Sequence, residues 1–82
     1  MPIAMGPRGT VYQASIATEP CEGGFKATVC RVIFLMPSSA IGTEVQHEPF
    51  PAHFAKSKHR AEQAAAAHFN LWAKLQWLDS KR

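Results

Sequence analysis

Apolar and polar positions alternate with a period of two between Val11 and Ala17. Tyr12, Ala14 and Ile16 fall on one side of this alternation, and mostly polar residues fall between them. Successive side chains of a β-strand point to opposite faces of a sheet, so the pattern predicts a strand with one buried face.

A turn and a second strand follow. The segment 19–24 contains Pro20, which we expect to stop the first strand, and two adjacent glycines that can adopt the positive φ of a tight turn. The alternation resumes over 25–29, and the run 32–36 is apolar at every position. Two strands joined by a short glycine-containing loop predict a β-hairpin.

A third extended segment is expected within 41–54. We place its ladder over 42–47, because the two prolines further along suit an edge strand or a bulge better than a central strand. Phe50 and Phe54 are then expected to fold back onto the core.

The last predicted element is a helix over about residues 58–78. Ser57 is the candidate N-cap, because its hydroxyl can accept a hydrogen bond from an amide of the first turn. One stripe at helical spacing is expected to face the sheet. Its members are Ala61, Ala65, His68, Trp72 and Leu75, flanked by Ala64, Leu71 and Leu78.

The order strand, strand, strand, helix predicts an α+β fold in which a three-stranded antiparallel sheet packs on one long C-terminal helix. We expect an irregular leader over 1–10, a single domain over 11–79 and a frayed tail over 80–82. The chain of 82 residues, with 46% hydrophobic and 18% charged residues, is typical of one small globular domain.

The charge and the cysteine content of the chain limit which partners and which cellular compartment we expect for this domain. A net charge of +3 fits a polyanionic partner without requiring one. The longest apolar run is far shorter than the roughly 20 residues of a membrane-spanning helix, so no membrane association is expected. Cys21 and Cys30 without a signal-like N-terminus favour free thiols in a cytoplasmic or nuclear compartment, with a single disulfide as the alternative.

A cluster of basic residues lies at the predicted start of the helix. Lys56, Lys58 and Arg60 surround the candidate cap, with His59 beside them. The N-terminal end of a helix dipole is positive and favours anions, so cations there are slightly unfavourable unless an anion such as phosphate binds them. The alternative interpretation is an ordinary solvated helix start.

Several of these residues match a known sequence pattern. An aromatic residue in the first strand, a proline in the turn and a phenylalanine opening the second strand are Tyr12, Pro20 and Phe25. The helix start supplies Ser57-Lys58, Ala61-Glu62 and Ala64-Ala65. From Tyr12 to Leu75 the chain therefore resembles the double-stranded-RNA-binding domain family. The insertion 37–54 and the tail 75–79 are similar to the divergent version inside Dicer-type nucleases, whose sheet can bind a partner protein instead of, or besides, RNA.

The chain also departs from this family. The family begins with a helix that enters the RNA minor groove, and we expect none before Tyr12. Glu22 stands where the turn usually has histidine. Of the three basic positions at the helix start only Lys58 is kept, while His59 and Glu62 occupy the others. Weak, salt-dependent binding, assisted by neighbouring modules, is what the resemblance then implies.

Metal binding and catalysis are not expected. The candidate metal ligands are the two cysteines with His47, His53, His59 and His68. Their spacings match no usual zinc pattern, and His68 is assigned to the helix stripe. Glu44 and Glu48 would point to different faces of an extended segment, and no serine, histidine and acid are grouped. We predict no metal, no cofactor and no enzymatic activity.

The favoured function is non-catalytic binding of double-stranded or structured RNA. Its predicted contact residues are Lys56, Ser57, Lys58, His59 and Arg60. The alternative is a protein-interaction or dimerisation module, whose predicted surface is Val32, Phe34, Met36 and Trp77. Trp72 is assigned to the core, whereas Trp77 either folds under the sheet or anchors a partner. HicB-type antitoxins and the three-stranded DNA-reading domains of integrases are further families with this element order.

Overall fold

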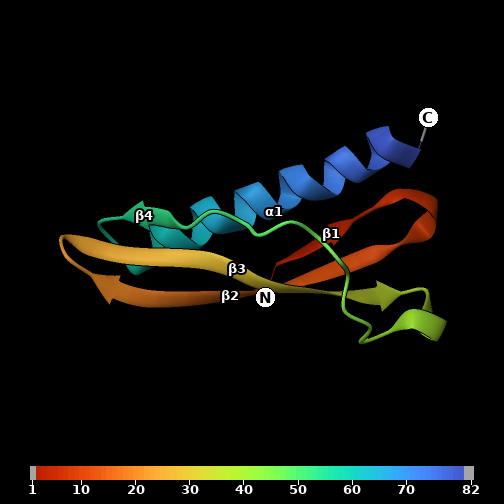
Figure 1. Ribbon diagram of the computed structural model, residues 1–82, viewed down its shortest axis with the longest axis horizontal. Helices are drawn as coiled ribbons and strands as arrows, with labels where there is room; N and C mark the ends of the chain where they lie inside the picture. Colours follow the sequence, from red (N-terminus) through yellow and green to blue (C-terminus); the bar gives the residue numbers. More distant parts are fainter. Residues whose placement is uncertain (1, 81–82) are drawn as a thin grey trace.

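The computed structural model describes residues 2–80 and shows a four-stranded antiparallel sheet with one long C-terminal helix (Figure 1). The elements are β1 (Ile3–Met5), β2 (Val11–Cys21), β3 (Gly24–Met36), β4 (His53–Ala55) and α1 (Lys58–Ser80), with short 3-10 turns at Pro7–Gly9 and Ser38–Ala40. The strands lie in the order β1-β2-β3-β4, so each strand pairs with its neighbour in sequence. The predicted α+β class is confirmed, with four strands where three were expected.

The long β2–β3 hairpin forms the body of the sheet. Its turn is Glu22 and Gly23, and Gly23 adopts a φ of 83° that suits glycine. Pro20 was expected to end the first strand, but it lies inside β2 and pairs with Phe25. This is possible because β1 pairs only with residues 11–13, so β2 is an edge strand at Pro20 and a missing amide is tolerated.

The β2–β3 ladder has two register shifts, and the one between Ser15 and Ile16 changes which side chains of β3 face the helix. Ser15 pairs with Arg31 but Ile16 pairs with Val29, so one residue of β3, Cys30, bulges out of the ladder. Val29 and Val32 are consequently both buried, although they are three residues apart. The apolar run after Arg31 therefore does not supply one continuous outward-facing row of side chains.

The segment 1–10 is not wholly irregular, which corrects the prediction. Ile3–Met5 forms β1 and pairs with residues 11–13 of β2. The prolines do not interrupt this pairing, because Pro2 precedes the strand and Pro7 lies in the turn. At the other end α1 includes Ser80, which was assigned to the frayed tail; Met1 and residues 81–82 lie outside the described residues.

The third predicted strand is also displaced. Part of the predicted ladder is present, because residues 42–45 pair with β3 through the bridge between Glu44 and Ile33 and through backbone hydrogen bonds to Val32 and Phe34. The regular strand, β4, lies further along and pairs with residues 25–27. The prolines, which were expected to suit an edge strand or a bulge, precede β4 and leave its three amides available for pairing, and β4 is an edge strand of the sheet. Phe50 is buried as expected, whereas Phe54 is 68% exposed.

One face of the sheet packs against α1 (Figure 1). The buried core consists of Ala4, Tyr12, Ala14, Ala27, Val29, Val32, Phe50, Ala61, Ala65, Phe69 and Ala73. The helix contributes residues spaced by four, so its buried stripe runs through Phe69 and Ala73, while Leu75 and its flanking leucines are exposed. Trp72 is half-buried and packs edge-on to Tyr12 at a centroid distance of 5.0 Å.

Candidate nucleic-acid interface

Ser57 caps the start of α1, as the sequence predicts. The backbone N–H of Arg60 donates to Ser57 Oγ over 3.2 Å, and the N–H of Ala61 donates to the Ser57 carbonyl over 3.1 Å. The serine side chain thus satisfies one of the amides that a helix start leaves without an intrahelical partner. This cap fixes where the helix begins and, with it, the positions of the neighbouring basic side chains.

All five predicted contact residues, 56–60, are exposed to solvent. Lys56 precedes the cap, and Lys58, His59 and Arg60 occupy the first turn of α1. Successive residues of a helix point in directions about 100° apart, so these side chains spread around the helix end instead of forming one row. An anion that approaches along the helix axis can therefore meet several of them at once.

The cations of this segment have no carboxylate partner among the described side chains, those of residues 2–78. The ion pairs of this part of the chain are Lys26 with Glu19 at 2.6 Å and Arg31 with Glu44 at 4.0 Å. Glu62, the acid of the second helical turn, instead accepts a hydrogen bond from Thr18 Oγ over 3.1 Å. The positive charge at the helix start is thus not neutralised by the described side chains.

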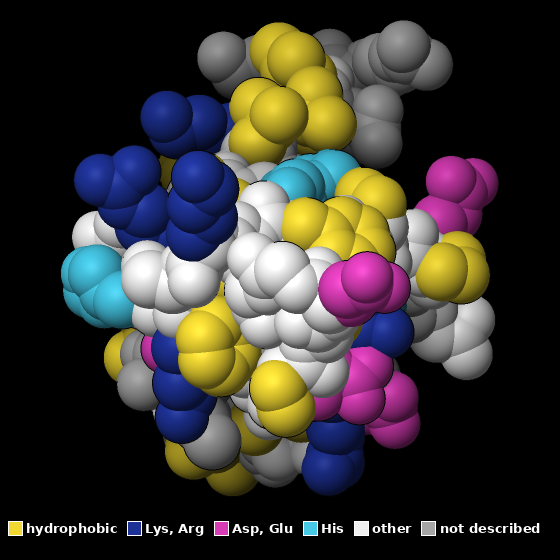
Figure 2. Space-filling model, turned by 90° about the vertical axis from the view of Figure 1, so that its left-hand side faces the viewer, with side chains coloured by type: hydrophobic (Ala, Val, Ile, Leu, Met, Phe, Trp, Pro, Cys, Tyr) yellow, Lys and Arg dark blue, Asp and Glu magenta, His cyan; other side chains and the backbone are white. Residues whose placement is uncertain are grey.

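Figure 2 shows the end of the molecule that carries the helix start and the β2–β3 turn. One group of Lys and Arg side chains gathers at the upper left of this view, apart from the acidic side chains, while other Lys and Arg side chains lie lower in the view, some of them next to acidic ones. The upper-left group gives a polyanion a preferred side of approach.

The β2–β3 turn borders the helix start. A shallow hollow of about 190 Å³ lies between the turn, β4 and Lys56, and Glu22 is among its lining residues. The carboxylate of Glu22 therefore lies beside the basic segment. It opposes binding of phosphate at this edge, and any polyanion must bind chiefly to the helix side.

The predicted partner surface is largely wrong. Val32 is fully buried, and Phe34 is half-buried and packs on Tyr12 at 5.4 Å, because the bulge turns both toward α1. Met36 and Trp77 are 48% and 42% exposed. The indole N–H of Trp77 donates to the Met5 carbonyl over 3.2 Å, which ties the end of α1 to β1.

Other apolar side chains are exposed instead. On β1 they are Ile3 and Met5, and on the second half of α1 they are Leu71, Leu75 and Leu78. The three leucines recur at intervals of four and three residues, so they form one stripe along the helix. The sequence pattern had assigned this stripe to the core, because it is as regular as the buried one.

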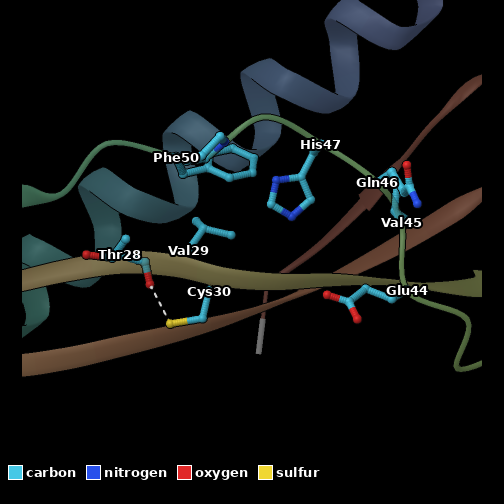
Figure 3. A pocket seen from close by; sticks show the side chains of 9 residues that line it. Thr28, Val29, Cys30, Glu44, Val45, Gln46, His47 and Phe50 are labelled. Atoms are coloured by element: carbon cyan, nitrogen blue, oxygen red, sulfur yellow. Dashed lines mark hydrogen bonds between the residues drawn. The ribbon is translucent and has the colours of Figure 1, made fainter.

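The cysteines and His47 do not form a catalytic pair. Cys21 and Cys30 are free thiols, and Cys30 Sγ donates to the Thr28 carbonyl over 3.6 Å. Figure 3 shows a hollow of about 640 Å³ between β3 and the loop 44–50, with the His47 ring pointing into it and the Cys30 sulfur turned away toward Thr28. A thiol needs a base within hydrogen-bond reach to act as an activated nucleophile, and this arrangement does not supply one.

One pair of histidines is brought together that the sequence spacing did not suggest. His53 Nε2 lies 3.1 Å from His68 Nδ1, although the two residues are 15 positions apart. The signal that could have found them is the assignment of His53 to an extended segment and of His68 to the helix stripe that packs on it. Among the side chains that the structure describes, those of residues 2–78, no group of three or more potential metal ligands occurs.

No helix within the described part of the chain is both long and apolar enough to cross a bilayer. Comparisons with protein-family models, with curated proteins and with solved structures find no match for this chain.

Proposed function

We propose that this domain binds double-stranded or structured RNA, without catalysis, through Lys56, Ser57, Lys58, His59 and Arg60. The observation that carries the proposal is the exposure of these consecutive residues at a capped helix start whose cations pair with no described carboxylate. The sequence of the helix start supports it, since it resembles the double-stranded-RNA-binding domain family.

The chemistry of this segment suits phosphate. A helix N-terminus presents amide hydrogens and the positive end of the dipole, and lysine and arginine add charge-assisted hydrogen bonds to phosphate oxygens. Duplex RNA is recognised mainly by shape and by its backbone, because its major groove is too narrow for side chains to read bases. A small set of cations at one helix end is adapted to that kind of contact.

The element order supports the same proposal. In β2, β3, β4 and α1 the chain has an antiparallel meander followed by a helix that packs on it, with the basic residues directly after the last strand. Lys56 is the residue directly after β4, so the pairing of β4 with β3 fixes where the basic segment begins. With three or four cations in contact, affinity is expected to be low and to depend strongly on salt.

We assign the domain to a cytoplasmic or nuclear setting. Cys21 and Cys30 are both free thiols, and reduced cysteines persist mainly in reducing compartments. Structured RNA is present in the same compartments, so the assignment agrees with the proposed ligand. Recovering both thiols unmodified from the native source would support this setting.

The direct test is a titration followed by amide resonances. A duplex RNA of about 16 base pairs, the length that one domain of this family spans, is added at low salt. The expected result is a set of shifts confined to residues 56–62, which the substitutions Lys58→Ala and Arg60→Ala together abolish. Lys74→Ala is the matched control, because Lys74 is an exposed cation on the same helix, about four turns further along.

Two outcomes contradict the proposal. The first is a titration without shifts at low salt, and the second is a response that Lys74→Ala removes as fully as the double variant. A duplex DNA of the same length, titrated in parallel, separates recognition of RNA geometry from binding to any polyanion.

A second candidate function is self-association through exposed apolar side chains. Met5 is 69% exposed on β1, and Leu71 and Leu78 are 55% and 62% exposed on α1. The two leucines lie on one stripe of the helix, and exposed apolar patches often mark a protein interface. Sedimentation equilibrium tests it: a dimer that Leu71→Glu and Leu78→Glu dissociate supports this candidate, and a monomer at all concentrations contradicts it.

A further inference from the structure

We propose that His53 of β4 and His68 of α1 form a binding site for a first-row transition-metal ion that prefers imidazole, such as Zn²⁺, Ni²⁺ or Cu²⁺. The facing nitrogens, Nε2 of His53 and Nδ1 of His68, are 3.1 Å apart. Each ring comes from a different element, so an ion held by both would link the last strand directly to the helix.

The separation of these nitrogens suits a shared ion. Zinc binds imidazole nitrogen at about 2.0–2.1 Å, so two nitrogens of a tetrahedral site lie about 3.4 Å apart. The present pair is therefore closer than that separation by only a few tenths of an ångström. The two ring planes are inclined by 78°, so a modest rotation of each side chain turns both lone pairs toward one point.

The proton balance of this change is simple. In the present contact one imidazole donates its N–H and the other accepts, so one of the two facing nitrogens carries a hydrogen. When the ion binds, the donating ring shifts that hydrogen to its other nitrogen and uses the freed lone pair. Two neutral imidazoles thus become two ligands without net release of a proton.

The surroundings of the pair leave room for an ion. A hollow of about 440 Å³ is lined by His53, Ala64, Ala67, His68 and Leu71, with no lysine or arginine among them. Both histidines are half-exposed, so an ion can reach them from solvent. Phe50 packs edge-on to the His68 ring at 5.4 Å, which limits the orientations of that ring in advance of binding.

The chemistry of the pair predicts its selectivity. Among the side chains of residues 2–78 no third ligand joins the pair, so the remaining coordination positions fall to water and the affinity is moderate. Imidazole ligands favour Cu²⁺ over Ni²⁺ and Zn²⁺ and bind Mg²⁺ and Ca²⁺ poorly. The site is separate from the basic residues and does not depend on the proposed RNA binding.

The experiment adds ZnCl₂, up to about 1 mM, to the full chain without an affinity tag. Ring resonances of His53 and His68 should shift, while those of His47 and His59 should not, and a chelator should reverse the change. An ion that binds only the folded state stabilises that state. At a free zinc concentration 100 times the dissociation constant, the folding equilibrium constant should rise by about a hundredfold, and the melting temperature should rise with it. MgCl₂ should leave both readouts unchanged.

Variants locate the site. His53→Ala and His68→Ala should each abolish the zinc-induced rise in melting temperature, whereas His59→Ala, which removes an exposed histidine outside the hollow, should retain it. Replacing Cys21 and Cys30 by Ser should also retain it, which excludes the thiols as the ligands. The wild-type titration decides the matter even if a histidine variant fails to fold. Absence of any ring shift at 1 mM zinc, or shifts centred on His47, His59 or the thiols, would overturn the proposal and leave the pair as a structural hydrogen bond.

Discussion

Val29 and Val32 lie three residues apart on β3, and yet both side chains are buried beneath α1. In a regular strand they would point to opposite faces. The bulge at Cys30 adds one residue to β3 opposite the Ser15–Ile16 step of β2, so the two valines share a face. The bulge therefore decides which apolar residues build the core and which remain at the surface.

The first prediction tests this assignment with one conservative change. Val32→Thr keeps the shape of the side chain but places a hydroxyl in the core, and an unpaired buried hydroxyl costs about 1–3 kcal/mol. Met36→Thr, at a position 48% exposed, should change the free energy of unfolding by less than about 0.5 kcal/mol. Urea denaturation of both variants measures the difference. Equal losses would place Val32 at the surface and contradict the bulge.

The second prediction concerns the largest buried side chain of α1. Phe69 is fully buried, and Phe69→Ala should cost about 3–5 kcal/mol. A chain of this size has roughly 4–12 kcal/mol of stability, so the loss is a large share of the total and the urea midpoint should fall markedly. Leu78→Ala, at an exposed position of the same helix, should be close to neutral. A folded Phe69→Ala protein with unchanged stability would show that the helix packs by another face.

Periodicity predicted the first half of the sheet but not the second. The alternation from Tyr12 to Val29 gave the buried face correctly, because a two-residue period is a direct consequence of strand geometry. The bulge after Val29 has no sequence signal of its own, so Val32 and Phe34 were expected on the wrong face, whereas Met36, beyond the second register shift, is exposed as expected. β4 was missed for another reason: three residues are too few to show a period.

The helix illustrates a second limit of periodicity. Two stripes on α1 are equally regular, one through Phe69 and Ala73 and one through Leu71 and Leu75. Helical spacing identifies each stripe but does not say which one faces the sheet. The cap at Ser57 was predicted correctly, because it depends only on the residue itself and on the amides of the following turn.

The third prediction separates stability from ligand binding at this cap. Ser57→Ala removes the acceptor for the Arg60 amide and should cost about 1 kcal/mol of stability. Because the Ser57 side chain carries no charge, its loss should weaken RNA binding less than Arg60→Ala does. Ser57→Asp keeps a capping oxygen and should retain stability, but it adds a carboxylate among the cations and should weaken RNA binding. Chemical denaturation and RNA titration of both variants measure the two effects. An aspartate variant that binds RNA as well as the wild type would argue against phosphate at this position.

The fourth prediction uses the ion pair of the hairpin. The Glu19 carboxylate accepts a hydrogen bond from Lys26 Nζ at 2.6 Å, and this bond together with its charge raises the pKa of Lys26 above 10.5. A raised folded-state pKa contributes stability that is complete below the unfolded-state pKa and is lost as the pH rises through the folded-state value. Unfolding free energies at pH of about 9 and 11 should therefore fall more in the wild type than in Glu19→Gln. The difference is expected to be small because Lys26 is exposed to solvent, and equal falls would show that the pair contributes nothing.

One of the two candidate sites could be predicted from the sequence, and the other could not. The basic segment 56–60 is contiguous, so its composition and its exposure at a helix start could be read directly from the chain. The histidine pair depends on the register of β4 against α1, which places His53 beside His68 across 15 residues. The spacing of residues in the sequence does not predict that contact, because it arises from packing between two elements rather than within one.

The most direct test of the central claim is the salt dependence of RNA affinity. For each phosphate contact that a cation makes, the logarithm of the association constant falls by about 0.9 per tenfold increase in salt. Three contacts from Lys56, Lys58 and Arg60 predict a slope of about −2.7, and Arg60→Ala should reduce it to about −1.8. Lys74→Ala should leave the slope unchanged. A slope near zero, or one that Arg60→Ala does not alter, would contradict binding of a polyanion at the start of α1.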